Sequence, residues 1–202
     1  MARSEPAITA PPSRGGAGQE TLSASALRDL VMEMGADDCG FMDIDDPCVD
    51  VDREYILRCF PNTKTLISLV CRMHVEPVRS PNRTVANLEF HQAGHDVDEV
   101  ARNVVRYFED SGIKAINTPM AFPMEMEHFP DRGWIVSHKL IAEGAGMGKR
   151  GLHRSLIHHR FGSFVLLGTV LLDARVDSLS KALDFNPCFE CKLCVAACPV
   201  GA

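Results

Sequence analysis

The sequence predicts a mixed α/β (α+β) fold, on two observations. Segments with the apolar spacing of amphipathic helices alternate with short runs of β-branched and aliphatic residues typical of strands. Apolar residues make up 46% and charged residues 24% of the 202 residues, which is the composition of a globular chain. That length suits one main domain with a small appendage.

The first part of the chain alternates helix and strand. Apolar residues from Leu27 to Met34 recur at helical spacing, and Gly35 suits the end of that helix. Residues 38–44 suit a short strand, and residues 52–60 suit a helix. Residues 65–73, rich in β-branched residues, predict a strand buried in the interior of a sheet.

The second part repeats this alternation around a long irregular segment. An apolar stripe from Val97 to Phe108 predicts a helix that ends at Ser111-Gly112, and residues 113–117 suit a strand. Residues 118–134 contain three prolines and predict a long loop. A glycine-rich stretch then leads into an apolar strand over residues 164–172.

Composition also indicates the domain limits and excludes some classes of protein. Residues 1–20, rich in Ala, Pro, Gly and Ser, predict a flexible tail, residues 21–180 the main domain and residues 181–202 a separate motif. Because no apolar run approaches 20 residues and no signal peptide is visible, we expect a cytoplasmic protein without a membrane helix. The net charge of -6 makes nucleic acid an unfavourable partner.

Four of the eight cysteines lie close together near residue 202. Cys188, Cys191, Cys194 and Cys198 fit C-x2-C-x2-C-x3-C followed by proline, a spacing typical of [4Fe-4S] ligands. Zinc is the alternative, but zinc sites usually separate two cysteine pairs by a longer spacer. The fourth cysteine either completes a single cluster or, as in two-cluster ferredoxins, ligates a second cluster whose motif follows in a longer chain.

The remaining cysteines are scattered and suggest no site. Cys39, Cys48, Cys59 and Cys71 are nine to twelve residues apart. A single cysteine commonly behaves as a small buried hydrophobic residue. We therefore expect each of the four to pack in the core.

The segment from Ala142 to Asp173, followed by the cysteine motif, resembles epoxyqueuosine reductases and reductive dehalogenases. Those families share a glycine run like "GAGMGKRG", then Leu-Ile, a Gly-Ser step and an apolar strand ending in Asp. Weaker similarity extends upstream. The resemblance implies a nitroreductase-like sandwich that binds cobalamin, followed by the start of a ferredoxin-like module. It further implies that the corrinoid is lined by Gly146, Gly148, Gly151, Leu156, Ile157 and Gly162.

Two departures from the family pattern bear on the substrate. Epoxyqueuosine reductases have an acidic residue that donates a proton, and the matching position here is Asn117, which cannot donate in that way. Val97 replaces a family tyrosine. His158, beside the glycine run, is an alternative proton donor, so Asn117 and His158 are the catalytic candidates. A basic stretch, Lys149 to Arg160, could face a corrinoid phosphate or only solvent.

Two functions therefore stay open at the level of sequence. One is an iron–sulfur oxidoreductase that passes electrons from the cluster to cobalamin, with an unidentified substrate and a donor such as ferredoxin or flavodoxin. The other is an electron-transfer or binding module without catalysis of its own. The glycine run together with the cluster motif favours the first, whereas Asn117 favours the second.

Overall fold

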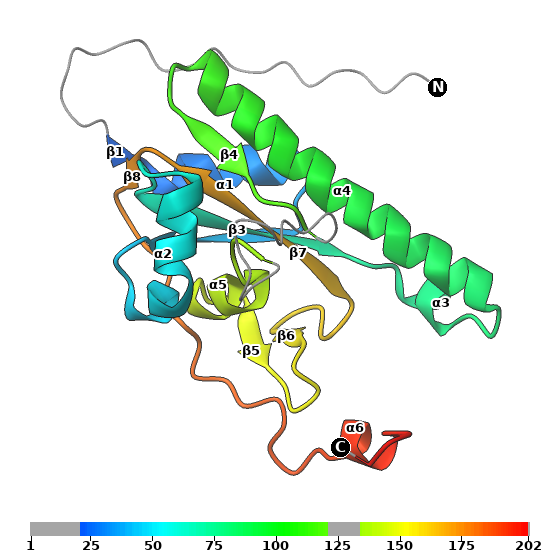
Figure 1. The fold of residues 1–202 in the computed structure, drawn as a ribbon. Helices are drawn as coiled ribbons and strands as arrows, with labels where there is room; N and C mark the ends of the chain where they lie inside the picture. Colours follow the sequence, from blue (N-terminus) through cyan, green and yellow to red (C-terminus); the bar gives the residue numbers. More distant parts are fainter. Residues whose placement is uncertain (1–20, 121–133, 202) are drawn as a thin grey trace, which may run out of the picture.

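A computed structural model describes residues 21–120 and 134–201, and a four-stranded antiparallel sheet lies at its centre (Figure 1). In spatial order its strands are β2 (Asp38–Asp43), β3 (Thr65–Arg72), β7 (Val165–Leu172) and β4 (Ala115–Asn117). The long strands β3 and β7 pair along their whole length. The mixed α/β class and the two predicted interior strands are confirmed.

Helices cover both faces of this sheet, so the domain has three layers (Figure 1). On β3, Ile67 and Leu69 pack with α1 (Ala24–Glu33) and α4 (Arg83–Asp110). Leu66 and Val70 alternate to the opposite face, as side chains of a strand must. That face packs against the short helix η1 (Pro47–Val49), α2 (Asp50–Cys59) and α5 (His138–Gly144).

Helix α4 begins well before the apolar stripe that predicted it. The Asn82 side chain accepts a hydrogen bond from the Thr84 amide at 3.0 Å and so caps the helix at Arg83. Its buried residues start only at Ala93, so the first turns extend past the sheet beside α3 (Val75–Arg79). No helix in the described ranges is long and apolar enough to cross a membrane.

Two small strand pairs and a final helix complete the described chain. β1 (Thr21–Leu22) pairs in parallel with β8 (Arg175–Val176), and β5 (Gly148–Arg150) pairs with β6 (Leu156–His158) as an antiparallel hairpin. The last helix, α6 (Leu193–Ala196), lies within the cysteine motif. Residues 1–20 and most of the expected loop at 118–134 fall outside the described residues.

The expected core role holds for only two of the scattered cysteines. Cys39 and Cys71 are buried in strands β2 and β3, and burial raises the pKa of each thiol to about 12. Cys48 and Cys59 are exposed, so the prediction that they pack in the core is wrong. Cys48 lies in η1 and Cys59 is the last residue of α2.

Candidate functional site

The β5–β6 hairpin places the glycine run against two other stretches of backbone. We call residues 146–162 the glycine hairpin. A Cβ on Gly148 would lie 2.1 Å from the Ile157 carbonyl oxygen, and one on Gly146 would lie 2.5 Å from that of Lys181. Gly146 also has a φ of +74°, which side chains rarely tolerate. Both glycines are therefore required by the packing of this chain itself.

The other residues expected around a corrinoid occupy different environments on the same hairpin. Leu156 is 3% exposed and packs in the core beneath the hairpin, whereas Ile157 is half-buried. Gly162, with a φ of +62°, closes the turn after β6 by two backbone hydrogen bonds with His158. Gly151 lies at the tip. The hairpin thus brings the predicted residues together, with the Leu156 side chain directed inward.

His158 is buried and attaches the hairpin to the start of β2. Its Nδ1 accepts hydrogen bonds from the amides of Arg160 and Phe161 at 3.1 and 3.3 Å. The neutral ring therefore carries its proton on Nε2, which lies 3.4 Å from an Asp38 carboxylate oxygen without good hydrogen-bond geometry. The ring also stacks between His159 and Phe161. His158 is 1% exposed, so it supports the hairpin from inside.

Asp38, His158 and His159 offer three ligand atoms within 4.8 Å of one another. Two observations oppose a metal ion there. The proton on His158 Nε2 occupies the lone pair that a metal would need, and the guanidinium of Arg28 already pairs with Asp38 at 3.0 Å. Burial alone would raise the pKa of Asp38, but its contacts with His158, the Cys39 amide and Arg28 outweigh burial and lower that pKa.

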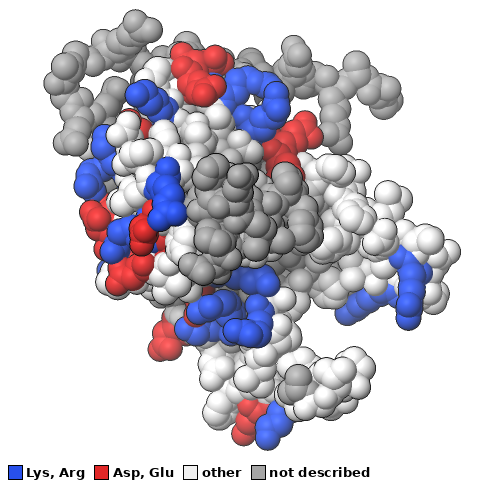
Figure 2. Space-filling view, viewed as in Figure 1, with Lys and Arg blue, Asp and Glu red and all other residues white. Residues whose placement is uncertain are grey.

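A basic cavity of about 650 Å³ lies beside the glycine hairpin. Figure 2 shows Lys and Arg side chains gathered over this part of the surface. Glu143 is the acid among the described residues that line it, and it pairs with Lys149 at 2.7 Å and Arg150 at 2.6 Å. Burial alone would raise the pKa of Glu143, but these two hydrogen bonds outweigh burial and lower it. Among the described lining residues positive charge is in excess, because they also include Lys139 and Arg154.

The cysteine motif follows as a loop and a short helix that contact the tip of the hairpin. None of the eight cysteines forms a disulfide bond, although all lie in the described ranges. Cys188 accepts a hydrogen bond from the Leu152 amide, with 3.4 Å between nitrogen and sulfur. Cys194 lies in α6. Cys188, Cys194 and Cys198 are partly buried and Cys191 is exposed, so none of the four motif cysteines is fully buried.

The end of β4 forms a third part of the site. Asn117 is exposed on the last position of β4, opposite Val170. Just beyond it, His138 Nε2 donates to the Pro119 carbonyl at 2.9 Å, and His138 Nδ1 lies 2.9 Å from the Thr169 hydroxyl. Burial lowers the pKa of His138, although the contact with the Pro119 carbonyl acts in the opposite direction. His138 therefore anchors residues 118–119 to β7 in its neutral form.

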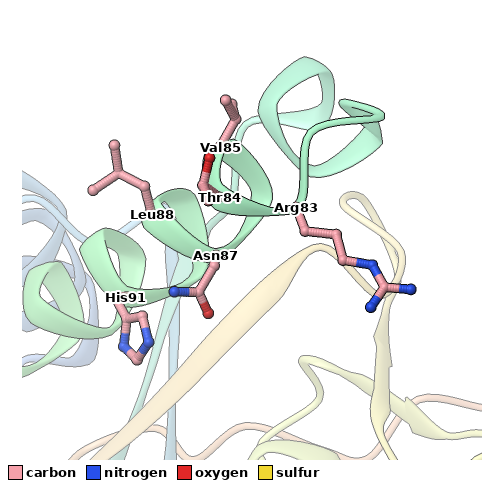
Figure 3. Close-up of a pocket in the computed structure, with 6 residues that line it drawn as sticks. All are labelled: Arg83, Thr84, Val85, Asn87, Leu88 and His91. Atoms are coloured by element: carbon pink, nitrogen blue, oxygen red, sulfur yellow. The ribbon is translucent and has the colours of Figure 1, made fainter.

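A larger cavity, of about 780 Å³, is remote from these groups. It lies along the exposed first turns of α4 and is lined by Arg83, Thr84, Val85, Asn87, Leu88 and His91 (Figure 3). None of the residues singled out by the sequence lines it. We therefore place the candidate site at the glycine hairpin, the cysteine motif and the end of β4.

Sequence reasoning missed Asp38 and did not single out His138 among the histidines. Each is a single polar residue whose partner is distant in the chain: Asp38 meets His158, and His138 meets Thr169 and Pro119. The position of His138 shortly before the apolar residues Leu140 and Ile141 was the available signal, but it does not reveal those partners.

Comparison with curated proteins identifies relatives of one kind. A protein of Listeria monocytogenes named epoxyqueuosine reductase is 35% identical over 79 residues, which are 39% of this chain and 20% of that protein. One of Prochlorococcus marinus with the same name is 26% identical over 156 residues, covering 74% of this chain and 45% of that protein. The chain thus spans less than half the length of these relatives. No family model matches the sequence.

Solved structures of both expected families share the fold. An epoxyqueuosine reductase solved with an epoxyqueuosine-modified tRNA stem loop superposes with a TM-score of 0.58 at 14% identity, over 88% of this chain and 52% of that one. A reductive dehalogenase described as B12-dependent superposes with a TM-score of 0.63 at 15% identity, over 85% of this chain and 22% of that one. The resemblance inferred from the sequence is confirmed, and its named relatives are oxidoreductases.

The lowered pKa of His138 predicts a specific pH dependence of stability. In the unfolded state the His138 side chain takes up a proton with a pKa of about 6.5. In the folded state the pKa of His138 is lower, so the ring stays neutral to lower pH. The contribution of neutral His138 to the free energy of unfolding is complete above the unfolded pKa. It is lost as the pH falls through the folded pKa. We expect the free energy of unfolding, measured with urea, to decline from pH 7 to pH 5.5. His138→Gln should remove most of that slope, and an unchanged slope would contradict the assignment.

Proposed function

We propose that this chain is part of an iron–sulfur oxidoreductase in which a [4Fe-4S] cluster delivers electrons to a corrinoid. The observation that carries the proposal is the contact between the cysteine motif and the tip of the glycine hairpin, at Leu152 and Cys188. It brings the two segments that the sequence assigned to the two cofactors into one site. The fold shared with a B12-dependent dehalogenase supports the same assignment.

The cysteine motif has the donor set that a [4Fe-4S] cluster needs. Cys188, Cys191 and Cys194 would hold one cluster, with Cys198 as its fourth ligand or as a ligand of a second cluster. The loop turns sharply, because Glu190 has a φ of +57° and the Cys191 amide donates to the Cys188 carbonyl. In this proposal the turn would allow the loop to bring successive thiolates to one cluster. A bound cluster would supply one-electron chemistry at low potential.

The chemical character of the surface beside the hairpin suits a corrinoid. The half-buried Ile157 and the glycine backbone offer apolar surface and close approach, as a flat macrocycle requires. The cationic cavity of Lys139, Lys149, Arg150 and Arg154 suits the phosphate of its nucleotide tail. When bound, the corrinoid would supply the cobalt centre for reduction. Asn117 would lie near the substrate and donate hydrogen bonds through its amide.

The alternative is an electron-transfer module without chemistry of its own. Asn117 favours this second function, because an amide cannot serve as the proton-donating acid of the related reductases. The close packing at Gly146 and Gly148 favours it as well, because those glycines are explained without a ligand. The two functions differ in whether the folded, cluster-loaded protein takes up a corrinoid.

Substitution of one motif cysteine should abolish cluster binding. Reconstitution of the anaerobic protein should give about four iron atoms per cluster and a brown chromophore. Cys191→Ala should lose nearly all of that iron while the circular dichroism of the α/β domain stays unchanged. The matched control is Cys48→Ala, another exposed cysteine, which should retain full iron. Bound zinc without iron in the native sequence would overturn the assignment.

Corrinoid uptake should separate the two functions. We expect the cluster-loaded protein to bind cobalamin in the base-off form with one corrinoid per chain, measured by its visible spectrum after gel filtration. Arg150→Glu, together with Lys149→Glu, should weaken that binding because it places acids where the phosphate tail would lie. Folded protein that carries its cluster but takes up no cobalamin would favour the electron-transfer module.

Because position 117 is an asparagine, we expect this protein to have poor activity on epoxyqueuosine in tRNA. A positioned general acid contributes roughly 10²–10⁴-fold to rate, and Asn117 cannot provide it. Queuosine formation by reduced, corrinoid-loaded protein should be slow, and Asn117→Asp should accelerate it at least about tenfold. Asn87→Asp, which adds the same charge at an exposed position on α4, is the control. Rapid turnover by the native sequence would contradict the prediction, and no turnover by either form would indicate another substrate.

A further inference from the structure

The hydrogen bond between Leu152 and Cys188 joins a backbone donor to a thiol. The distance of 3.4 Å from the Leu152 nitrogen to Cys188 Sγ is normal for a hydrogen bond to sulfur. The donor is the backbone amide of Leu152, a residue that is 60% exposed. The donor therefore depends on the conformation of the hairpin tip.

Local hydrogen bonds hold the tip in the conformation that presents this amide. The Gly151 amide donates to the Ser155 carbonyl at 3.0 Å, and the Arg154 amide donates to the Gly151 carbonyl at 2.8 Å. Arg154 has a φ of +63°, which tightens the turn. The Ser155 amide donates to Nδ1 of His153. The amides of Gly151, Arg154 and Ser155 are thus hydrogen-bonded within the turn. The Leu152 amide is instead hydrogen-bonded to the sulfur of Cys188.

The chain that leads to Cys188 is fixed at a second point. Ser180 exchanges two hydrogen bonds of 2.9 Å with the backbone of Phe41, at the free edge of β2. The next residue, Lys181, places its carbonyl oxygen against Gly146 at the base of the hairpin. The segment that leads to the cysteine motif therefore contacts the base of the hairpin, and the motif itself contacts the tip.

We propose that the Leu152 amide donates a hydrogen bond to the Cys188 thiolate of the bound cluster and thereby raises the reduction potential of that cluster. This inference rests on the proposed cluster ligation. The reduced cluster carries one more negative charge than the oxidised cluster, part of it on the thiolate sulfurs. A hydrogen bond to that sulfur stabilises the reduced state more than the oxidised state. The glycine hairpin thereby sets the potential of the group that it contacts.

The test compares Leu152→Pro, which lacks the amide hydrogen, with Leu152→Ala, which keeps it. Iron and acid-labile sulfide are measured first, and the midpoint potential is then determined by titration with dithionite, followed by electron paramagnetic resonance. Dithionite supplies the one electron that the cluster takes up. Leu152→Pro should shift the midpoint to more negative potential, whereas Leu152→Ala should match the native protein.

Each outcome bears on a separate claim. Equal midpoints for the native, Ala and Pro forms, all with full iron, would overturn the role of Leu152 but leave the cluster in place. Absence of a cluster from the native protein would overturn both. If the Pro variant fails to fold or to load iron, an ester in place of the amide at residue 152 removes the hydrogen and keeps the side chain. A native midpoint in that ester would overturn the proposal.

Discussion

The contact of two backbones at Gly148 is the constraint on which the candidate site depends. Any Cβ there would lie 2.1 Å from the Ile157 carbonyl, so β5 and β6 pair only with glycine at this position. When the hairpin is paired, Leu156 is buried in the core and His158 lies beside Asp38. The pairing also extends the tip as far as Cys188. A short strand pair thus connects the sheet to the cysteine motif.

The sheet supplies the rigid frame for this arrangement. Strands β3 and β7 are buried on both faces, and β7 holds the Thr169 hydroxyl beside His138. The end of β4, which pairs with β7, and the hairpin, which reaches β2 through His158, are consequently attached to the same frame. Charge is distributed unevenly, because the cavity beside the hairpin is cationic although the whole chain has a net charge of -6. An anionic ligand is therefore favoured there locally.

Elements whose sequence pattern extends over many residues could be predicted, whereas short elements could not. The apolar strands, the stripe in α4 and the cysteine spacing each repeat over enough residues to be recognised. The three-residue strands β5 and β6 show no periodicity, and the start of α4 depends on one capping side chain, Asn82. Polar partners distant in sequence, such as Asp38 and His158, became visible only when the sheet brought them together. The exposure of Cys48 likewise depends on tertiary packing.

Hydrogen–deuterium exchange with and without iron and sulfide tests the central claim most directly. The claim is that the cysteine motif, once it holds a cluster, is fixed against the glycine hairpin. The account predicts slower exchange on cluster loading at residues 150–156 and at residues 178–190, with little change in α4, which lies on the other face of the sheet. Slower exchange confined to the cysteine motif, with the hairpin unaffected, would contradict it.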